Sequence, residues 1–267
     1  MKIIRYTTPT GNVEYAGKLG VAEYKVIQGD LFKEWSLTEE QASIHKILSP
    51  IVPSSIIGIG LNYRYHAEET QSPIPQYPIM FMKLPSSVQN PGDPILLPAK
   101  LRSTKVDYEC ELAVIIGKTA RNVSRENALS YVLGYTCAND VSARDWQKHA
   151  GGHQWCRSKT FDTFCPLGPS LVTADEIQNP NQLGIKTILN GETVQDWNTH
   201  DMIFDVPAII EFLSADTTLL PGTVILTGTP QGVGMARTPP IWLKPGDEVS
   251  IEIEGIGVLH NPVAQAE

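Results

Sequence analysis

Two glutamates separated by a single residue, Glu109 and Glu111, stand in an otherwise apolar stretch. The residues from Val106 to Gly117 are mostly β-branched or apolar and have no helical period, which predicts a strand. Alternate strand residues share a face, so the two carboxylates would lie side by side. A divalent cation would relieve their repulsion and the cost of burying them. The alternative is an edge strand with both side chains hydrated, and the spacing alone does not decide between the two.

A third carboxylate, Asp140, ends the next predicted strand, over 134–140. Ser124 is a candidate N-cap for a helix over about 125–132 that would precede this strand. If the strands are neighbours, Asp140 lies close to the two glutamates. Three carboxylates suit a hard cation, Mg²⁺ or Mn²⁺, and no Cys/His cluster indicates zinc. Taken alone Asp140 would be a turn residue, but in this company the metal interpretation is favoured.

A histidine and a glutamate three residues apart follow a buried strand predicted over 56–61. Asn62 is a candidate N-cap for a short helix that would place His66 and Glu69 on one face. A carboxylate bonded to one imidazole nitrogen leaves the other nitrogen free to act as a base. The alternative is an exposed helical turn with an ordinary ion pair. The proline-rich loop 71–78 could cover a site as a lid.

Arg144 and Gln147 follow the third carboxylate closely. A guanidinium fork and an amide are suitable partners for a substrate carboxylate. The alternative is a capped helical turn in which Arg144 pairs with Asp145. The dipeptide Gly151-Gly152 indicates a hinge-like break.

Two lysines and a glycine-rich loop complete the candidate site residues. Lys159 lies in an aromatic-rich sequence and either snorkels to solvent or points to an anionic site. Lys83, at the end of a predicted strand, is either a surface residue or part of the site wall. The loop 228–234 lacks the ending of a phosphate-binding loop. Its amides could bind a carboxylate with help from Thr229, and a tight turn is the alternative.

The composition is that of an ordinary globular protein, with 267 residues, of which 42% are hydrophobic and 19% charged. A net charge of -8 without long basic runs argues against nucleic acid or an anionic membrane as partner. No apolar stretch is long enough to span a bilayer, and the first residues resemble a strand rather than a signal peptide. We therefore expect a cytoplasmic protein. The four cysteines lack CxxC spacing and are expected to be free, non-catalytic thiols.

The chain divides into two parts. Residues 1–52 predict a small β-rich segment with one helix, over 38–48, that begins with a capping box of Thr38 and Gln41. Its strands are expected over 3–7, 13–16 and 21–27. Residues 53–267 contain every candidate site residue and predict one larger domain.

Two local signals in the larger part are strong. The dipeptide Asn190-Gly191 predicts a hairpin over 185–195. Asp205 predicts a capped helix over 206–214. Strands outnumber helices throughout, so the expected fold class is mainly β with some α.

Five ordered motifs resemble those of the fumarylacetoacetate hydrolase superfamily. They are Gly-Leu-Asn-Tyr-(x)₂-His-(x)₂-Glu at 60–69, Tyr-Glu-Cys-Glu-Leu-Ala-Val-Ile-Ile-Gly-Lys at 108–118, Gly-Tyr-(x)₃-Asn-Asp-Val-Ser-Ala-Arg-Asp at 134–145, Lys-Thr-Phe-Asp-Thr-Phe-Cys-Pro-Leu-Gly-Pro at 159–169 and Ile-Leu-Thr-Gly-Thr-Pro-Gln-Gly-Val-Gly at 225–234. The resemblance covers about residues 54–263. Residues 140–173 are most similar to the branch called fumarylacetoacetate hydrolase domain-containing protein 2.

The resemblance implies a mixed β-roll or β-sandwich with a few helices, usually dimeric through this domain. It implies that Glu109, Glu111 and Asp140 hold Mg²⁺ or Mn²⁺. It also implies that His66 and Glu69 form a catalytic dyad on a lid that orders over substrate. Each of these positions holds the residue type that the family pattern requires.

The resemblance further implies that Lys159 belongs to the catalytic site near the metal, and that Arg144, Gln147 and Thr229 contact substrate. The family's substrates are small 2-oxo or 2,4-dioxo acids. The expected reaction is hydrolysis of a C–C bond in an acylpyruvate-type substrate through a metal-bound enolate, with His66 activating water. The same site could instead catalyse keto–enol tautomerisation of oxaloacetate, or its decarboxylation. A non-catalytic metal-binding β-roll is a remote alternative, because a structural metal needs no base beside it.

Overall fold

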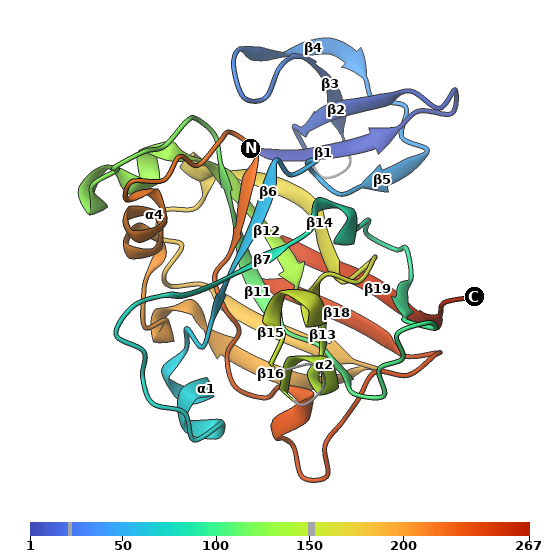
Figure 1. The fold of residues 1–267 in the computed structure, drawn as a ribbon. Coiled ribbons are helices and arrows are strands. Elements are labelled where there is room, and N and C mark those ends of the chain that lie inside the picture. The colour runs from blue at the N-terminus through green and yellow to red at the C-terminus, as the bar shows by residue number, and fades with distance from the viewer. Residues whose placement is uncertain (21–22, 149–152) are drawn as a thin grey trace.

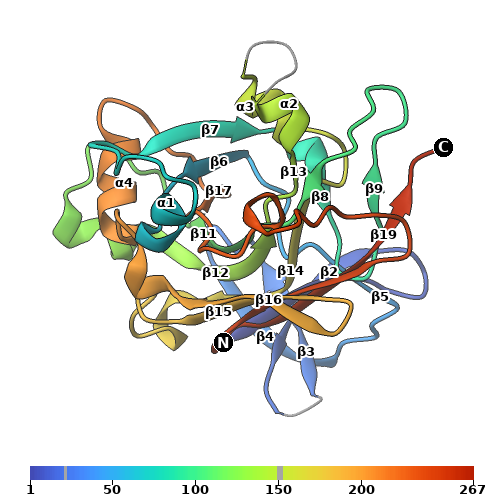
Figure 2. The same ribbon diagram turned by 90° about the horizontal axis from the view of Figure 1, so that it is seen from below.

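The computed structural model describes residues 1–20, 23–148 and 153–267. Two β-sheets contain most of the residues in regular secondary structure, and the helices are short (Figures 1 and 2). The blue N-terminal strands lie at one end of the molecule, and the orange and red strands of the second sheet lie across the first (Figure 1). The prediction of a mainly β fold with some α is therefore confirmed.

The long sheet contains twelve strands. They are β1 (Lys2–Thr7), β2 (Val13–Lys18), β3 (Tyr24–Gly29), β4 (Trp35–Gln41), β5 (Lys46–Leu48), β6 (Ser55–Gly60), β7 (Ile79–Lys83), β8 (Val88–Gln89), β11 (Cys110–Ile116), β12 (Val132–Asn139), β14 (Cys165–Thr173) and β17 (Thr223–Leu226). Their order is β4-β3-β2-β1-β14-β12-β11-β17-β6-β7, with β5 beside β1 and β8 beside β14.

The second sheet has the order β16-β15-β18-β19-β9. Its strands are β9 (Ile95–Leu97), β15 (Gly184–Leu189), β16 (Glu192–Asn198), β18 (Glu248–Ile253) and β19 (Gly257–Gln265), and a separate pair is made by β10 (Val106–Asp107) and β13 (Ser142–Ala143). The α-helices are α1 (Arg64–Glu69), α2 (Arg144–Lys148), α3 (Trp155–Lys159) and α4 (Val206–Ser214). The 3-10 helices are η1 (Pro85–Ser87), η2 (Arg125–Tyr131), η3 (Ala174–Glu176), η4 (Thr199–Asp201) and η5 (Gly234–Ala236).

Strand β11 lies at the centre of the fold, and all of its residues are buried. It pairs with β12 on one side and β17 on the other, while β15 and β18 of the second sheet pack across it. Burial on both faces explains its continuous apolar run. Cys110 lies opposite Asn139, and the Asp140 amide donates to the Glu109 carbonyl at 2.9 Å. The predicted adjacency of these two strands is confirmed.

The strong local signals are also confirmed. Strands β15 and β16 form the predicted antiparallel hairpin, with Asn190 and Gly191 at φ values of 52° and 84°. Positive φ at both central residues is what a two-residue hairpin turn requires. Helix α4 begins at the predicted residue, and its N-cap Asp205 accepts a hydrogen bond from the Ala208 amide at 3.0 Å.

The helix predicted over 38–48 is wrong. These residues form the end of β4, a short connection and β5. Leu37 pairs with Ile27 of β3, and the Thr38 hydroxyl donates to the Val26 carbonyl instead of capping a helix. Strand pairing with β3 therefore overrides the local capping signal. Strand β1 also pairs with β14, so the N-terminal sheet is continuous with the rest, and the boundary at residue 52 stays a prediction.

Two further details differ from expectation. The strand predicted from Val106 onward is interrupted, because the Asp107 carboxylate accepts from the Tyr108 amide and the Asn139 side chain accepts from the Glu109 amide. Ser124 makes no side-chain cap bond to η2, and Asn62 makes none to α1. The Asn62 amide instead bonds the backbone of the loops at 204 and 227.

Several other expectations have an outcome in the fold. The four cysteines are free thiols, as predicted. Among the residues that the structure describes, no helix is long and apolar enough to cross a membrane. The hinge predicted at Gly151-Gly152 and the first two residues of the strand predicted over 21–27 lie outside the described residues.

Candidate active site

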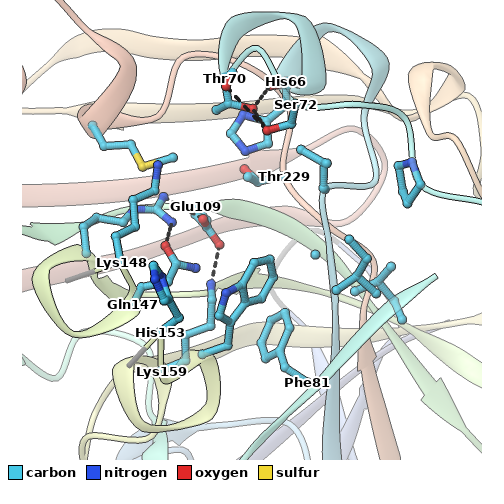
Figure 3. A pocket seen from close by; sticks show the side chains of 18 of the residues that line it. His66, Thr70, Ser72, Phe81, Glu109, Gln147, Lys148, His153, Lys159 and Thr229 are labelled. Carbon is cyan, nitrogen blue, oxygen red and sulfur yellow. Dashed lines mark hydrogen bonds and ion pairs between the residues drawn. The ribbon is translucent and has the colours of Figure 1, made fainter. Parts of the chain in front are cut away.

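A cavity of about 670 Å³ lies beside α1, α2, α3 and β7 (Figure 3). Seven of the nine predicted site residues line it, and they are His66, Glu109, Glu111, Arg144, Gln147, Lys159 and Thr229. The other two, Glu69 and Asp140, lie behind this lining and bond to His66 and Lys159. Apolar side chains, among them Ile74, Phe81 and Trp155, form the remaining wall. The predicted lid loop contributes Ser72 to Pro75 to the lining.

The three predicted metal ligands are brought together as expected. Carboxylate oxygens of Glu109, Glu111 and Asp140 lie within 4.8 Å of one another, and all three residues are buried. Glu109 and Glu111 flank Cys110 at the start of β11, and Asp140 follows the end of β12. The pairing of β11 with β12 is therefore what assembles the cluster.

Two lysines neutralise part of this cluster and bond different oxygens of Asp140. Lys159 of α3 places its Nζ 2.7 Å from Glu109 Oε2 and 2.5 Å from Asp140 Oδ2. Lys83 of β7 places its Nζ 2.6 Å from Asp140 Oδ1, with no side-chain exposure. The surface interpretation of Lys83 is therefore wrong. The alternation in β7 could have found it, because Phe81 and Lys83 share the buried face of that strand.

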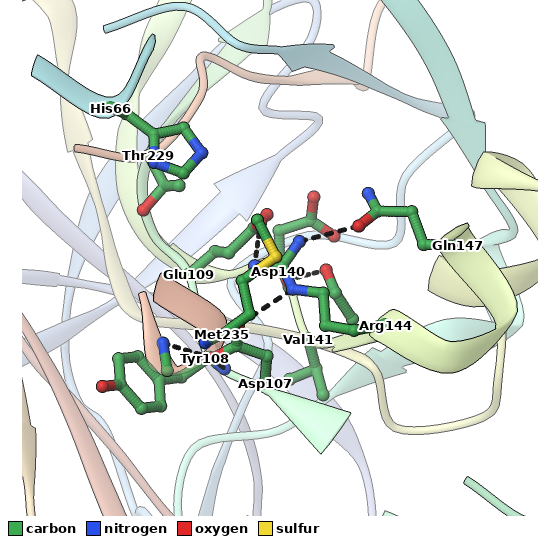
Figure 4. Close-up of polar contacts among 12 residues, drawn as sticks. His66, Asp107, Tyr108, Glu109, Asp140, Val141, Arg144, Gln147, Thr229 and Met235 are labelled. Atoms are coloured by element: carbon green, nitrogen blue, oxygen red, sulfur yellow. Dashed lines mark hydrogen bonds and ion pairs between the residues drawn. The ribbon is translucent and has the colours of Figure 1, made fainter. Parts of the chain in front are cut away.

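Arg144 is held by side chains that sequence reasoning did not connect with it (Figure 4). Its Nε donates to Asp107 Oδ2 at 2.8 Å, and its Nη1 donates to Gln147 Oε1 at 3.0 Å. Its Nη2 lies 2.6 Å from Glu109 Oε1 as an ion pair without hydrogen-bond geometry. The alternative partner Asp145 instead accepts from Ser103. Asp107 was missed, although alternation in the predicted strand places it on the face of Glu109 and Glu111, because its partners lie on distant segments of the chain.

The glycine-rich loop binds carboxylates through its backbone amides, but the carboxylates are the protein's own. Gly228 N–H donates to Glu111 Oε2 at 2.7 Å, and Gly232 N–H donates to Glu69 Oε1 at 2.8 Å. Gly234 and Met235 donate to the two oxygens of Asp107 at 2.7 and 3.0 Å. One loop thus positions three acidic side chains from three different elements, α1, β10 and β11.

His66 is oriented as the sequence predicts. Its Nδ1 lies 3.1 Å from Glu69 Oε2, and its side chain is 8% exposed. Because a carboxylate can only accept, Nδ1 carries the hydrogen of this bond, and Nε2 faces the cavity (Figure 3). Glu69 is held in turn by the Gly232 amide, so the dyad does not depend on the short helix alone. The exposed-turn alternative is therefore wrong.

Burial and neighbouring charges shift the pKa values within the cluster. Burial, together with Asp140 and Glu109, raises the pKa of Glu111 well above its usual range. Burial acts in the same direction on Glu109, but Arg144 and Lys159 outweigh it and lower the pKa of Glu109. Burial opposes the charge of Lys159, but Asp140 and Glu109 outweigh it and raise the pKa of Lys159. Glu111 is thus the carboxylate with the least compensation.

The donor set fits a hard divalent cation. Three carboxylates converge from two strands, and oxygen ligands are those that Mg²⁺ and Mn²⁺ prefer. Among the described residues, Glu111 forms no ion pair with a lysine or arginine, and the Gly228 amide donates a hydrogen bond to its carboxylate. A cation beside Glu111 would supply the missing positive charge.

Comparisons with known proteins agree with this geometry. The family model described as fumarylacetoacetate (FAA) hydrolase C-terminal matches residues 55–264. The chain is 51% identical over 218 residues to oxaloacetate tautomerase fahd2, mitochondrial, of Xenopus laevis, covering 81% of this chain and 68% of that protein. It is 48% identical over 217 residues to oxaloacetate tautomerase FAHD2A, mitochondrial, of Homo sapiens, with the same coverage. The chain therefore belongs to the fumarylacetoacetate hydrolase family, and it is an enzyme of that family.

Solved structures of similar proteins include hydrolases and isomerases. The fumarylacetoacetate hydrolase of Exiguobacterium antarcticum superposes with a TM-score of 0.89 at 36% identity, and the 5-carboxymethyl-2-hydroxymuconate delta-isomerase of Mycobacterium smegmatis with 0.87 at 38%, each covering 100% of both chains. The maleylpyruvate hydrolase of a Sphingobium species, in complex with manganese(II) and pyruvate, superposes with 0.78 at 29%, also over 100% of both chains. The remote alternative of a non-catalytic β-roll is therefore wrong.

Adding Mg²⁺ or Mn²⁺ to metal-stripped protein is expected to raise its melting temperature by roughly 5–10 °C at about 100 times the dissociation constant. The shift arises because the cation binds the folded carboxylate cluster and not the unfolded chain. In Glu111→Gln the shift should disappear, while the metal-free melting temperature stays equal or rises, because a neutral amide replaces the least compensated carboxylate. Thermal unfolding by circular dichroism measures both. An undiminished shift in Glu111→Gln would exclude Glu111 as a ligand.

Proposed function

We propose that this enzyme is a divalent-metal-dependent oxaloacetate keto–enol tautomerase. The observation that carries the proposal is the oriented dyad, in which Glu69 binds His66 Nδ1 and leaves Nε2 for the cavity opposite the carboxylate cluster. The names of the two relatives support the choice of substrate. Tautomerisation removes one proton from C3 and adds one to the C2 oxygen, so it breaks no C–C bond and consumes no water. A single positioned base suits this reaction.

We propose Glu109, Glu111 and Asp140 as ligands of Mg²⁺ or Mn²⁺. A divalent cation there supplies positive charge that stabilises the enolate oxygen. Manganese is the ion in the related maleylpyruvate hydrolase structure, and the choice between the two metals stays open to the metal titration described above. Lys159 holds two of the carboxylates in place and adds a fixed charge beside them.

The amide of Gln147 is the proposed contact for a substrate carboxylate. Arginine only donates hydrogen bonds, so the bond from Arg144 Nη1 identifies the Gln147 oxygen as the acceptor. The Gln147 amide nitrogen is thereby left to donate into the cavity that this residue lines (Figure 3). Arg144 donates to Asp107 and Gln147 and forms an ion pair with Glu109, so we propose that it acts mainly by orienting Gln147. Direct contact of Arg144 with substrate stays a prediction.

Acylpyruvate hydrolysis is the second candidate function, and decarboxylation of oxaloacetate is a variant of the same chemistry. The observation that favours hydrolysis is the apolar wall of Ile74, Phe81 and Trp155. Beside this wall the cavity has room for an acyl group, so it can hold a substrate larger than a four-carbon acid. Similar solved structures named as hydrolases also support it. In that reaction His66 Nε2 takes a proton from the attacking water rather than from carbon.

The location of the protein stays a prediction. The names of both relatives include the word mitochondrial, which differs from the cytoplasmic location expected for this chain.

We propose that the cavity binds a small anionic 2-oxo acid. Three buried cations, Lys83, Arg144 and Lys159, lie close to the carboxylate cluster beside the cavity.

With Mg²⁺ present, we expect rapid loss of enol-oxaloacetate absorbance without release of pyruvate. The reaction moves a proton only, so pyruvate should not accumulate above the rate in Mg²⁺ buffer without protein. Absorbance measures the enol, and a separate coupled assay measures pyruvate. Acetylpyruvate cleavage in a parallel assay, at a rate above that of enol loss, would contradict the proposal in favour of a hydrolase. Equal rates of enol loss and pyruvate release would indicate a decarboxylase.

Replacing His66 by Ala should lower kcat by about 10²–10⁴-fold, because a positioned base is lost. The metal-induced rise in melting temperature should remain, since His66 contributes no ligand to the cluster. Glu109→Ala should lose both activity and the metal-induced rise. His45→Ala, an exposed histidine outside the cavity lining, is the control and should retain full activity. Metal-dependent turnover at the wild-type rate in His66→Ala would remove this residue as the base.

We also propose that the enzyme is a homodimer that uses the outer face of β7. Met80 and Met82, on the face opposite Phe81 and Lys83, are 54% and 39% exposed, and Leu84 is 53% exposed. An apolar strip of this kind on a strand is typical of an interaction surface.

The double substitution Met80→Lys and Met82→Lys is expected to reduce the molar mass in solution from twice 29.3 kDa to 29.3 kDa. If the dimer still formed, the two new lysines of each subunit would bury four positive charges in a symmetric contact. Light scattering after size exclusion measures the mass. Val13→Lys, at an exposed apolar position of the N-terminal sheet, is the control. A dimer that survives the double substitution would place the interface elsewhere.

A further inference from the structure

A buried glutamine of the second sheet reaches the glycine-rich loop that borders the cavity. Gln195 lies in β16 and is 2% exposed. Its Nε2 is 2.9 Å from Thr229 Oγ1 and 2.9 Å from the Pro230 carbonyl oxygen. Its Oε1 is 3.1 Å from the Cys110 amide and 2.7 Å from Thr187 Oγ1. This network connects β15, β16, β11 and the loop, and none of its contacts was expected from the sequence.

The backbone groups in this network determine which way the glutamine amide is oriented. The Cys110 amide can only donate, so the atom facing it must be the Gln195 oxygen. The Pro230 carbonyl can only accept, so the atom facing it must be the Gln195 nitrogen. Exchanging the two atoms would place two donors against each other and two acceptors against each other. The orientation of the Gln195 amide therefore follows from hydrogen-bond chemistry.

The orientation of Gln195 has a consequence for Thr229. A nitrogen donor of Gln195 points at Thr229 Oγ1, so that oxygen accepts and its own hydrogen must point elsewhere. Thr229 lines the cavity and lies beside His66 (Figure 4). The Cys110 thiol is a nearby alternative acceptor for the hydroxyl hydrogen, but a neutral sulfur is a weaker acceptor than a carboxylate oxygen.

We propose that Gln195 is a positioning residue that keeps Thr229 as a hydroxyl donor to an anionic oxygen of the substrate. The proposal rests on the proposed function for its ligand class, a 2-oxo acid carboxylate. Gln195 fills one of the two lone pairs of Thr229 Oγ1 and directs the hydroxyl hydrogen away from itself, so a carboxylate oxygen can accept that hydrogen and an ammonium cannot. The pair therefore selects acceptors, and it does so from outside the cavity lining, because Gln195 is not among the lining residues.

A purely structural role for Gln195 predicts different behaviour. Gln195 also holds the loop through the Pro230 carbonyl and holds β11 through the Cys110 amide. If these bonds were its whole contribution, its loss would lower stability and weaken substrate binding whether or not residue 229 carries a hydroxyl. If Gln195 acts through the Thr229 hydroxyl, its loss has no further effect on binding once that hydroxyl is absent.

The test is a double-mutant cycle of Thr229→Val and Gln195→Met, with pyruvate as the probe and saturating Mg²⁺. Isothermal calorimetry measures the pyruvate dissociation constant without turnover. Each single variant is expected to weaken binding about 10–100-fold, the range for a lost hydrogen bond to a charged group, and the double variant no more than either single. Thr229→Ser, which keeps the hydroxyl, should retain near wild-type affinity. The matched control is Gln265→Met, which removes a glutamine of β19 that donates to the Leu97 carbonyl of β9.

Independent, multiplicative effects of the two substitutions would overturn the positioning role, and so would unchanged affinity in Thr229→Val. If Gln195→Met does not fold, the isosteric Gln195→Glu serves in the same cycle, because a carboxylate there would attract the Thr229 hydrogen away from the cavity. Coupled effects on pyruvate binding without enol-oxaloacetate turnover would support this inference and contradict the tautomerase proposal. Wild-type protein that fails to bind pyruvate would contradict both.

Discussion

The structure depends on how four buried carboxylates are satisfied. Asp107, Glu109, Glu111 and Asp140 are each at most 5% exposed, and an uncompensated buried charge would be too costly for the fold. Three cations and the amides of one loop provide most of the compensation. The remaining deficit lies at Glu111, where a divalent cation fits. The same arrangement that compensates Asp107, Glu109 and Asp140 therefore leaves Glu111 in need of a cation.

The glycine-rich loop donates backbone hydrogen bonds to acidic side chains from several elements of the fold. It follows β17, the neighbour of β11, so its first amide reaches Glu111 directly. Its later amides reach Glu69 on α1 and Asp107 on β10, which lie on other segments of the chain. Gly228 and Gly232 have φ values of 96° and 97°, and a side chain at either position would meet neighbouring backbone. One loop thus fixes the position of Glu69, which bonds His66, relative to Glu111 of the carboxylate cluster.

The second sheet contributes to the site through a hydrogen bond to a residue of the cavity lining, and the side chain that makes this bond, Gln195, lies outside the lining. Gln195 fixes the direction of a hydroxyl hydrogen, as Arg144 fixes the direction of the Gln147 amide. In both cases a neighbour with defined donor character leaves its partner with a free donor. Two donors and several buried cations around one cavity support the proposed anionic substrate in a chain with a net charge of -8.

The sequence by itself was sufficient where the physics is local. The Asn190-Gly191 turn and the Asp205 cap depend on a few adjacent residues, and the shared face of Glu109 and Glu111 follows from strand geometry. The motifs also identified seven of the residues that line the cavity. Pairing between strands determined the rest of the fold. Strand β4 forms where a capping box predicted a helix, because its residues hydrogen-bond to the edge of β3. Lys83, Asp107 and Gln195 acquire their roles from partners between 34 and 127 residues away in the chain, and only the tertiary structure brings such partners together.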